Sequence, residues 1–259
     1  MKVTIYGGYG FNNAGDEAQL SSNLNFLESF IKKNRIQILS PNVTFTRKYH
    51  GVNKVYDAPK NIFFYFDQNK LINYKAISNS KYGIKRYINM FYQFFYIYRM
   101  ISLGFIFYIS KLFKNSTLLS IFFNNKVLDI YKHLSQTKVL FFSGGGYLTG
   151  PTKSRLWDSL FLIFLSKIFG YKVILSGQTI GITSSFIDRV FLRLALKQIS
   201  LLSTRDKNYS YDSVKQFKFK DIYEVADDAF FLSRTLDKPH DFLNHKNKIV
   251  TLQCHLHDV

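Results

Sequence analysis

The sequence predicts an α/β protein with a Rossmann-like parallel sheet and helices on both faces. Short apolar runs alternate with longer amphipathic stretches, which is typical of consecutive βαβ units. The run at 138–143 is almost continuously apolar, as expected for a strand in the middle of a parallel sheet. Glycine or polar clusters follow the apolar runs, so residues suited to binding a ligand are expected at one edge of that sheet.

The first βα unit carries the densest glycine cluster. A strand is expected over 3–6 and a helix over 16–32, with Asn13 or Asp16 as its cap. Free N–H groups at a helix N-terminus favour an anion. A dinucleotide fingerprint would need a third glycine after Gly8 and Gly10, at the position that Asn13 occupies. The loop is therefore interpreted as an anion or polar-ligand loop, or as a tight turn without a ligand.

The remaining elements follow from periodicity and length. Further strands are expected over 35–39, 55–57, 62–66, 138–143, 172–176, 201–204, 222–226 and 248–253, and further helices over 155–169, 186–200 and 209–217. Pro41 and the polar run after it break the pattern. Residues 82–123 are dense in Tyr, Phe and Ile with sparse cationic residues, and predict one or two helices. These helices either cover the sheet or lie in a membrane interface, since no uncharged run reaches the roughly 18 residues of a spanning helix.

The charge and the cysteine content of the sequence limit the classes of binding partner and the cellular compartment. The formal net charge of +18 favours anionic partners such as phosphorylated substrates, acidic glycans, nucleic acid or an anionic membrane surface. Abundant Lys, Asn, Ile, Phe and Tyr are also what an AT-rich genome encodes, so part of this charge reflects codon bias. The single cysteine, Cys254, excludes an internal disulfide framework and fits a reducing compartment, and no secretory signal is found. We therefore expect a cytoplasmic protein, at the inner face of the membrane if it binds lipid.

Five clusters at strand ends predict one binding site. They are 7–10, 144–146, 177–178, 205–206 and 227–228. Arg205 suits a bidentate grip on carboxylate or phosphate, or pairs with Asp206 or Asp227. Asp227 and Asp228 suit sugar hydroxyls or cap the turn. The candidate substrate-binding residues are Gly8, Gly10, Asn13, Asp16, Gly144, Gly145, Gly146, Gln178, Arg205 and Asp227.

Other kinds of site find little support. Cys254, His255 and His257 lie close together but lack a fourth ligand, so no metal is expected. The second glycine cluster is not a dinucleotide fingerprint either, because Thr149 stands where a third glycine is required. No serine-hydrolase elbow or nucleic-acid motif is present, and neither a cofactor nor a nucleic-acid partner is expected.

Taken together, five runs resemble the polysaccharide pyruvyl transferase family. They are Gly-Phe-Asn-Asn-Ala-Gly-Asp-Glu-Ala at 10–18, Phe-Ser-Gly-Gly-Gly-Tyr-Leu at 142–148, Gly-Gln-Thr-Ile-Gly at 177–181, Ser-Thr-Arg-Asp at 203–206 and Ala-Asp-Asp-Ala-Phe at 226–230. The resemblance implies two Rossmann-like domains of glycosyltransferase-B type. It also implies transfer of pyruvyl from phosphoenolpyruvate to a lipid-linked or polymeric sugar of a surface or capsular polysaccharide, as a ketal. Phosphoenolpyruvate is then a donor substrate and not a cofactor.

The resemblance also sets the expected domain boundaries. Residues 1–240 would form the N-terminal domain with a helical insertion at 70–133, and 241–259 would begin a truncated second domain. Two departures are Ile182, where the family usually has proline, and the absence of an Arg-x-His motif. The general acid, by resemblance a histidine, would belong to the missing domain, so the catalytic residues are unknown and the chain alone is expected to be inactive. The alternatives are a nucleotide-sugar glycosyltransferase of the same fold and an inactive fragment that folds or binds glycan.

Overall fold

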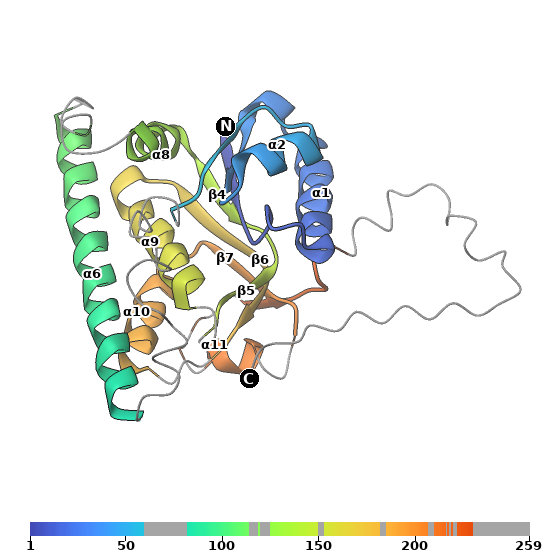
Figure 1. The fold of residues 1–259 in the computed structure, drawn as a ribbon. Coiled ribbons are helices and arrows are strands. Elements are labelled where there is room, and N and C mark those ends of the chain that lie inside the picture. The colour runs from blue at the N-terminus through green and yellow to red at the C-terminus, as the bar shows by residue number, and fades with distance from the viewer. Residues whose placement is uncertain are drawn as a thin grey trace, which may run out of the picture.

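A computed structural model describes residues 1–59, 82–113, 119, 125–149, 153–181, 185–206, 210–215, 217, 219 and 222–229. Its centre is a sheet of eight strands, all paired in parallel (Figure 1). The strands are β1 (Val3–Tyr6), β2 (Ile36–Ser40), β3 (Val55–Asp57), β4 (Val139–Phe142), β5 (Gly145–Leu148), β6 (Lys172–Ile180), β7 (Leu201–Thr204) and β8 (Ile222–Glu224). The expected Rossmann-like parallel sheet is confirmed.

The order of the strands places a switch point at the centre of the sheet. The order is β3-β2-β1-β4-β6-β7-β8, with β5 paired to β6 off this path. The chain therefore builds outward from β1 to β3, returns to the centre and builds the other way from β4. In doubly wound sheets, ligands bind at the carboxyl ends of the strands on either side of this reversal. Here those strands are β1 and β4.

Helices cover both faces of the sheet. α1 (Ala14–Glu28) and α2 (Val43–His50) lie on one side, and α8 (Asn125–Gln136), α9 (Lys153–Phe169) and α10 (Phe186–Leu196) lie on the other (Figure 1). α6 (Tyr82–Leu112) stands outside the second group, at the left edge of Figure 1, and packs on α9. The 3₁₀ helix η1 (Lys33–Arg35) and the short α11 (Asp212–Lys215) complete the elements among the described residues. Within the described residues, no helix is both long and apolar enough to cross a membrane.

Alternation along β1 divides the core into two clusters. Val3 and Ile5 pack with Leu20 of α1, while Tyr6 belongs to the larger cluster on the opposite face. α9 supplies much of that larger cluster, and its Trp157 is buried there, as the helix pattern predicts. The central strands are thus covered on both faces, which explains why their sequence runs are nearly continuously apolar.

Several boundaries differ from the sequence expectations. α2 was not predicted, since its one buried residue is the polar Thr46 and no apolar stripe marks it; Asn42 caps it by accepting from the Phe45 N–H (3.1 Å). β6 runs to Ile180, and its register shifts between Leu175 and Gln178, so Gly177 and Gln178 lie within the strand and not after it. Two of the three glycines expected in the second loop begin β5. The expected strands at 62–66 and 248–253 and the segment 241–259 lie outside the described residues.

Candidate functional site

The loop after β1 is fixed from two sides. Asn13 caps α1, as predicted, by accepting a hydrogen bond from the Gly15 N–H (3.1 Å). Gly10 has a φ of +92°, and its N–H donates to Glu17 Oε1 (2.7 Å). Glu17 Oε2 lies 2.8 Å from Nε2 of His50, and both side chains are 3% exposed. The buried Glu17 and His50 of α2 therefore fix the conformation of this loop beside the N-terminus of α1.

Tyr147 joins this loop to the second glycine cluster. Its hydroxyl accepts from the Gly8 N–H (2.8 Å) and donates to the Gly144 carbonyl (2.6 Å). Its ring fills the space beside Gly145, where an added Cβ would come within 2.2 Å of it. Burial, and next the neighbouring Asp16 carboxylate, raise the pKa of the Tyr147 hydroxyl. The hydroxyl therefore keeps its proton and remains a donor.

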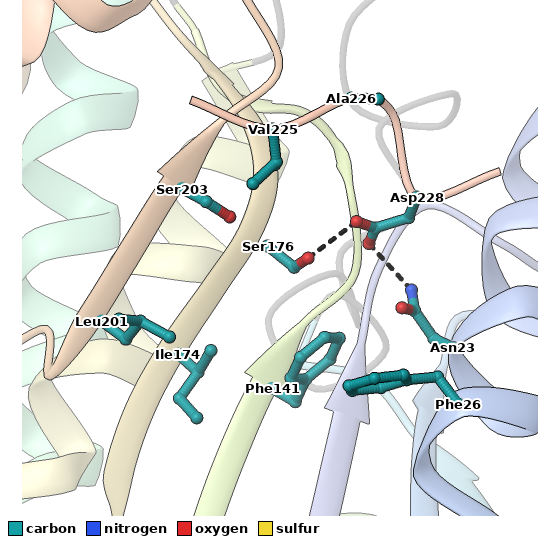
Figure 2. Close-up of a pocket in the computed structure, with 10 residues that line it drawn as sticks. All are labelled: Asn23, Phe26, Phe141, Ile174, Ser176, Leu201, Ser203, Val225, Ala226 and Asp228. Atoms are coloured by element: carbon teal, nitrogen blue, oxygen red, sulfur yellow. Dashed lines mark hydrogen bonds between the residues drawn. The ribbon is translucent and has the colours of Figure 1, made fainter. Parts of the chain in front are cut away.

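Asp228 is a buried carboxylate that ties three elements together. Oδ2 accepts from Asn23 Nδ2 (2.9 Å) and from the Gly144 N–H (2.7 Å), while Oδ1 accepts from the Ser176 hydroxyl (2.7 Å). Figure 2 shows Asn23 and Ser176 reaching Asp228 from α1 and from β6. The carboxylate is 1% exposed, so these donors replace the water that it loses on burial.

Two glutamines present buried acceptor atoms near the same edge. Gln178 donates through Nε2 to the carbonyls of Ser143 and Ser176, and Gln19 donates to Asp227 Oδ1 (2.8 Å). These bonds fix how each amide is turned. Oε1 of both glutamines is buried and has no hydrogen-bond partner among the described residues. Buried acceptors without donors are uncommon and indicate a place where a ligand or water donates.

Arg205 forms the outer part of the site. Nη1 donates to Asp227 Oδ2 (2.7 Å) and Nε donates to Thr179 Oγ1 (2.6 Å). Of the two partners considered from the sequence, Asp227 is the one it uses, because Asp206 accepts from Ser210. Burial raises the pKa of Asp227, but hydrogen bonds from the Ala229 N–H, Gln19 and Arg205 outweigh it, so the pKa is lowered. The Arg205 side chain is 35% exposed, which leaves the guanidinium accessible to an anion.

These groups form one continuous edge. The five clusters follow or lie in β1, β4, β6, β7 and β8, which are consecutive neighbours in the sheet. Hydrogen bonds link the clusters, from Gly8 through Tyr147 to Gly144, and from Gly144 through Asp228 to Ser176 on β6. Nowhere in the described ranges do three His, Cys, Asp or Glu side chains gather as a metal site would require. The described part of this edge presents backbone N–H donors, guanidinium groups and carboxylates.

A family model described as polysaccharide pyruvyl transferase matches residues 13–257. The chain belongs to the polysaccharide pyruvyl transferase family. No curated protein and no solved structure gives a significant match. The family name denotes a transferase, and the matched region contains all of the candidate site residues except Gly8 and Gly10.

Arg155 is a further candidate site residue of this pyruvyl transferase-like chain that the sequence analysis did not name. It lies in the first turn of α9, and its guanidinium carbon sits 5.2 Å from the centre of the Phe11 ring. A Cβ added at Gly8 would lie 3.2 Å from Arg155 Nη1 and 3.1 Å from Asp16 Oδ2. A cation in the first turn of a helix opposes the helix dipole. An arginine in a first helical turn that lacks any acidic residue is unusual, and this was the feature of the sequence that could have indicated Arg155.

Glu17 and Tyr147 had no predicted role, and Asp228, although considered for sugar hydroxyls or for capping the turn, was not among the candidate substrate-binding residues. Apart from the Gly144 carbonyl, three positions before Tyr147, the partners named above lie between 7 and 205 positions away in sequence, so no local motif reveals these roles. They do not replace the predicted residues. Instead they hold Gly8, Gly10 and Gly144 in place.

A pocket of about 450 Å³ adjoins this edge on the α1 side of the sheet. Figure 2 shows Asp228 at one end and the apolar Phe26, Phe141 and Leu201 towards the other. Its lining residues are Asn23, Phe26, Phe141, Ile174, Ser176, Leu201, Ser203, Val225, Ala226 and Asp228. The pocket thus continues the polar site into a mostly apolar space.

Proposed function

We propose that this polysaccharide pyruvyl transferase-like chain binds phosphoenolpyruvate at the carboxyl edge of its sheet and transfers pyruvyl to a sugar of a surface polysaccharide precursor. The observation that supports this most is the gathering of cationic and N–H groups along the carboxyl edge, from the switch point at β1 and β4 to the end of β7. The N-terminus of α1, the glycine loops, Arg155 and Arg205 all lie along the same edge. Phosphoenolpyruvate carries a phosphate and a carboxylate, which such groups recognise.

The reaction needs charge stabilisation more than a nucleophile from the protein. A proton is added to the methylene carbon, which leaves positive charge on the central carbon, and one sugar hydroxyl bonds to that carbon. The carbon–oxygen bond to phosphate then breaks, a second hydroxyl of the sugar bonds in its place, and both hydroxyl protons are lost. The products are inorganic phosphate and a pyruvyl ketal. Cations that hold the phosphate and carboxylate assist departure of the phosphate.

Each described residue has a defined task in this proposal. The Gly8 to Gly10 loop, α1 and Arg155 hold the phosphate, and Arg205 turns from Asp227 towards the carboxylate. The Asp227 carboxylate, whose side chain is 23% exposed, is an acceptor suited to sugar hydroxyls. The acceptor substrate is a lipid-linked or polymeric sugar.

The proton donor is not assigned to a described residue. His50 is bonded to Glu17 and buried, and His133 lies on α8, which precedes β4 and ends at the amino edge of the sheet. Both described histidines therefore lack access to a substrate at the carboxyl edge. By the family resemblance the donor is a histidine of a second domain, outside the described residues.

The proposal is tested by titrating the chain with phosphoenolpyruvate in a calorimeter. Arg205→Ala should weaken binding by roughly 10²-fold, which corresponds to about 2.7 kcal/mol. Arg205→Lys should recover little of it, because the bidentate geometry is lost. Arg155→Ala should lower affinity for inorganic phosphate as well, since its predicted contact is with the phosphate.

Arg193→Ala is the matched control, because Arg193 is an exposed arginine on α10. Its affinity for phosphoenolpyruvate should equal that of the wild type. Equal affinity in Arg205→Ala and Arg193→Ala would remove Arg205 from the site. Tight binding of a nucleoside diphosphate with none of phosphoenolpyruvate would instead favour a nucleotide-sugar glycosyltransferase. Phosphate release from phosphoenolpyruvate with lipid-linked sugars is the activity assay.

A further inference from the structure

The long helix α6 has one face buried against the protein. Met100, Leu103, Phe107 and Ser110 are at most 8% exposed. Phe107 packs edge-on against Tyr131 of α8 (5.4 Å between ring centres) and contacts Phe169 of α9. Lys111 donates to the Ile168 carbonyl at the end of the contact. The helix is therefore anchored to the domain, but through α8 and α9 and not through the sheet that the first of the two sequence interpretations expected it to cover.

The opposite face of α6 is apolar and exposed. Its residues recur at alternating steps of four and three, which places them in one stripe along the helix. We call Phe94, Tyr98, Ile101, Phe105, Tyr108 and Leu112 the α6 stripe; they are 54%, 70%, 62%, 63%, 48% and 58% exposed. In Figure 1, α6 is the outermost helix on its side of the molecule. Single exposed apolar residues are ordinary, but a continuous stripe indicates an interaction surface.

The charge of the segment around α6 indicates which kind of partner the α6 stripe would bind. Between Asp67 and Asp129 the sequence contains no acidic residue, although it contains nine lysines and arginines. A second copy docked through α6 would bring two such segments together with no acid in either to offset the repulsion. An anionic lipid surface would instead attract each cation near it. Aromatic residues dominate the stripe, and Tyr suits the boundary between headgroups and acyl chains because its ring is apolar and its hydroxyl polar.

We propose that the α6 stripe docks the protein onto an anionic membrane surface, with α6 lying in the plane of the interface. The stripe spans about 27 Å at 1.5 Å per residue. Its rings would enter the headgroup boundary while the buried face keeps the domain attached. This surface is separate from the carboxyl edge, so the inference does not depend on the donor substrate.

The test is co-sedimentation of the full chain with vesicles of phosphatidylglycerol and phosphatidylcholine, compared with vesicles of phosphatidylcholine alone. Binding should be stronger to the anionic vesicles and should weaken as salt is raised, because screening removes the charge term. The triple variant Tyr98→Ser, Ile101→Ser and Phe105→Ser should lower partitioning at least about tenfold. Its circular dichroism and unfolding midpoint should match the wild type, since all three side chains are exposed.

The control variant removes three comparably exposed aromatic residues elsewhere: Phe30→Ser, Tyr49→Ser and Phe186→Ser, at 73%, 59% and 72% exposure. It should bind vesicles as the wild type does. Equal vesicle binding by the two triple variants would overturn the proposal. It would also be overturned if light scattering showed a dimer that only the α6 variant dissociates, since the stripe would then be an interface between copies. Binding that is insensitive to lipid charge and to salt would contradict the choice of an anionic surface.

Discussion

The amino edge of the sheet, where the parallel strands begin, and the carboxyl edge, where they finish, both contain buried polar side chains. These side chains are bonded in different ways at the two edges. At the amino edge the hydroxyls of Thr4 and Thr137 lie 2.6 Å apart, and Gln37 Nε2 donates to both, at 3.0 and 3.2 Å. Thr137 also donates to the His133 carbonyl (2.9 Å). Every group in this cluster is neutral. The amino edge is a closed network that joins β1, β2 and the end of α8.

The carboxyl edge contains charges and incomplete bonding. Asp228 is buried with three donors, Arg205 and Asp227 form a half-buried pair, and the Oε1 atoms of Gln19 and Gln178 have no partner in the described part of the chain. Buried charge and unpartnered acceptors reduce stability unless another molecule completes them. The difference fits a structural role for the amino edge and the ligand-binding role that we propose for the carboxyl edge. Substitutions at the two edges should therefore separate stability from binding.

The largest loss of stability is expected for Asp228→Ala. It leaves the buried donors of Asn23, Gly144 and Ser176 without their acceptor, which should lower the free energy of unfolding by about 3–5 kcal/mol. Urea unfolding measures this. Asp57→Ala is the control, because Asp57 pairs with the half-exposed Lys126 at 3.5 Å and should contribute less than about 1 kcal/mol. Similar losses in the two variants would show that Asp228 does not hold the carboxyl edge together.

Gly145→Ala is expected to lower stability by about 2–3 kcal/mol. The new Cβ would overlap the Tyr147 ring at 2.2 Å, and moving that ring breaks its bonds to Gly8 and Gly144. Gly146→Ala is a neighbouring control, because a Cβ there meets no atom within 4 Å. Its unfolding free energy should stay within about 0.5 kcal/mol of the wild type. If both variants behave alike in urea, the ring is not fixed between the two loops.

The sequence allowed most of the sheet and the gathering of the five clusters along one edge to be predicted, since strand periodicity and the clusters after the strands are local signals. Val3–Tyr6 and Leu201–Thr204 agree with their expected limits. α2 was missed because its buried face is polar, and Gln178 was misplaced because the register shift in β6 leaves no local pattern. Arg155 was missed for a different reason. It approaches Gly8 only because β1 and β4 are neighbours in the folded sheet.

Thr137→Val tests the amino edge and should have a smaller effect, about 1–2 kcal/mol. It keeps the shape of the side chain but removes the hydrogen bonds to Thr4, Gln37 and His133. The dissociation constant for phosphoenolpyruvate should not change, because the substitution lies at the edge opposite the glycine loops. Calorimetry and urea unfolding on the same preparation measure both. A weakened affinity at unchanged stability would contradict the division of roles between the edges.

The smallest effect is expected from acid titration of Asp227, whose pKa is lowered by its hydrogen bonds despite its burial. Because the pKa is lower in the folded state than in the unfolded state, where it is near 3.9, the stabilisation is complete above about pH 4 and is lost as the pH falls through the folded pKa.

The free energies of unfolding of wild type and Asp227→Asn, measured in urea between pH 6 and 2.5, should differ by a constant amount above pH 4. That difference should shrink below it. Comparing the two proteins cancels the acid destabilisation that other carboxylates cause in both. In an Arg205→Gln background the difference above pH 4 should be smaller and should be lost completely at a higher pH, since one of the groups that lower the folded pKa is gone. A difference that stays constant down to pH 2.5, or grows, would show that Asp227 does not gain stability from its ionised form and that the Arg205 pair is too weak to distinguish the carboxyl edge from the neutral amino edge.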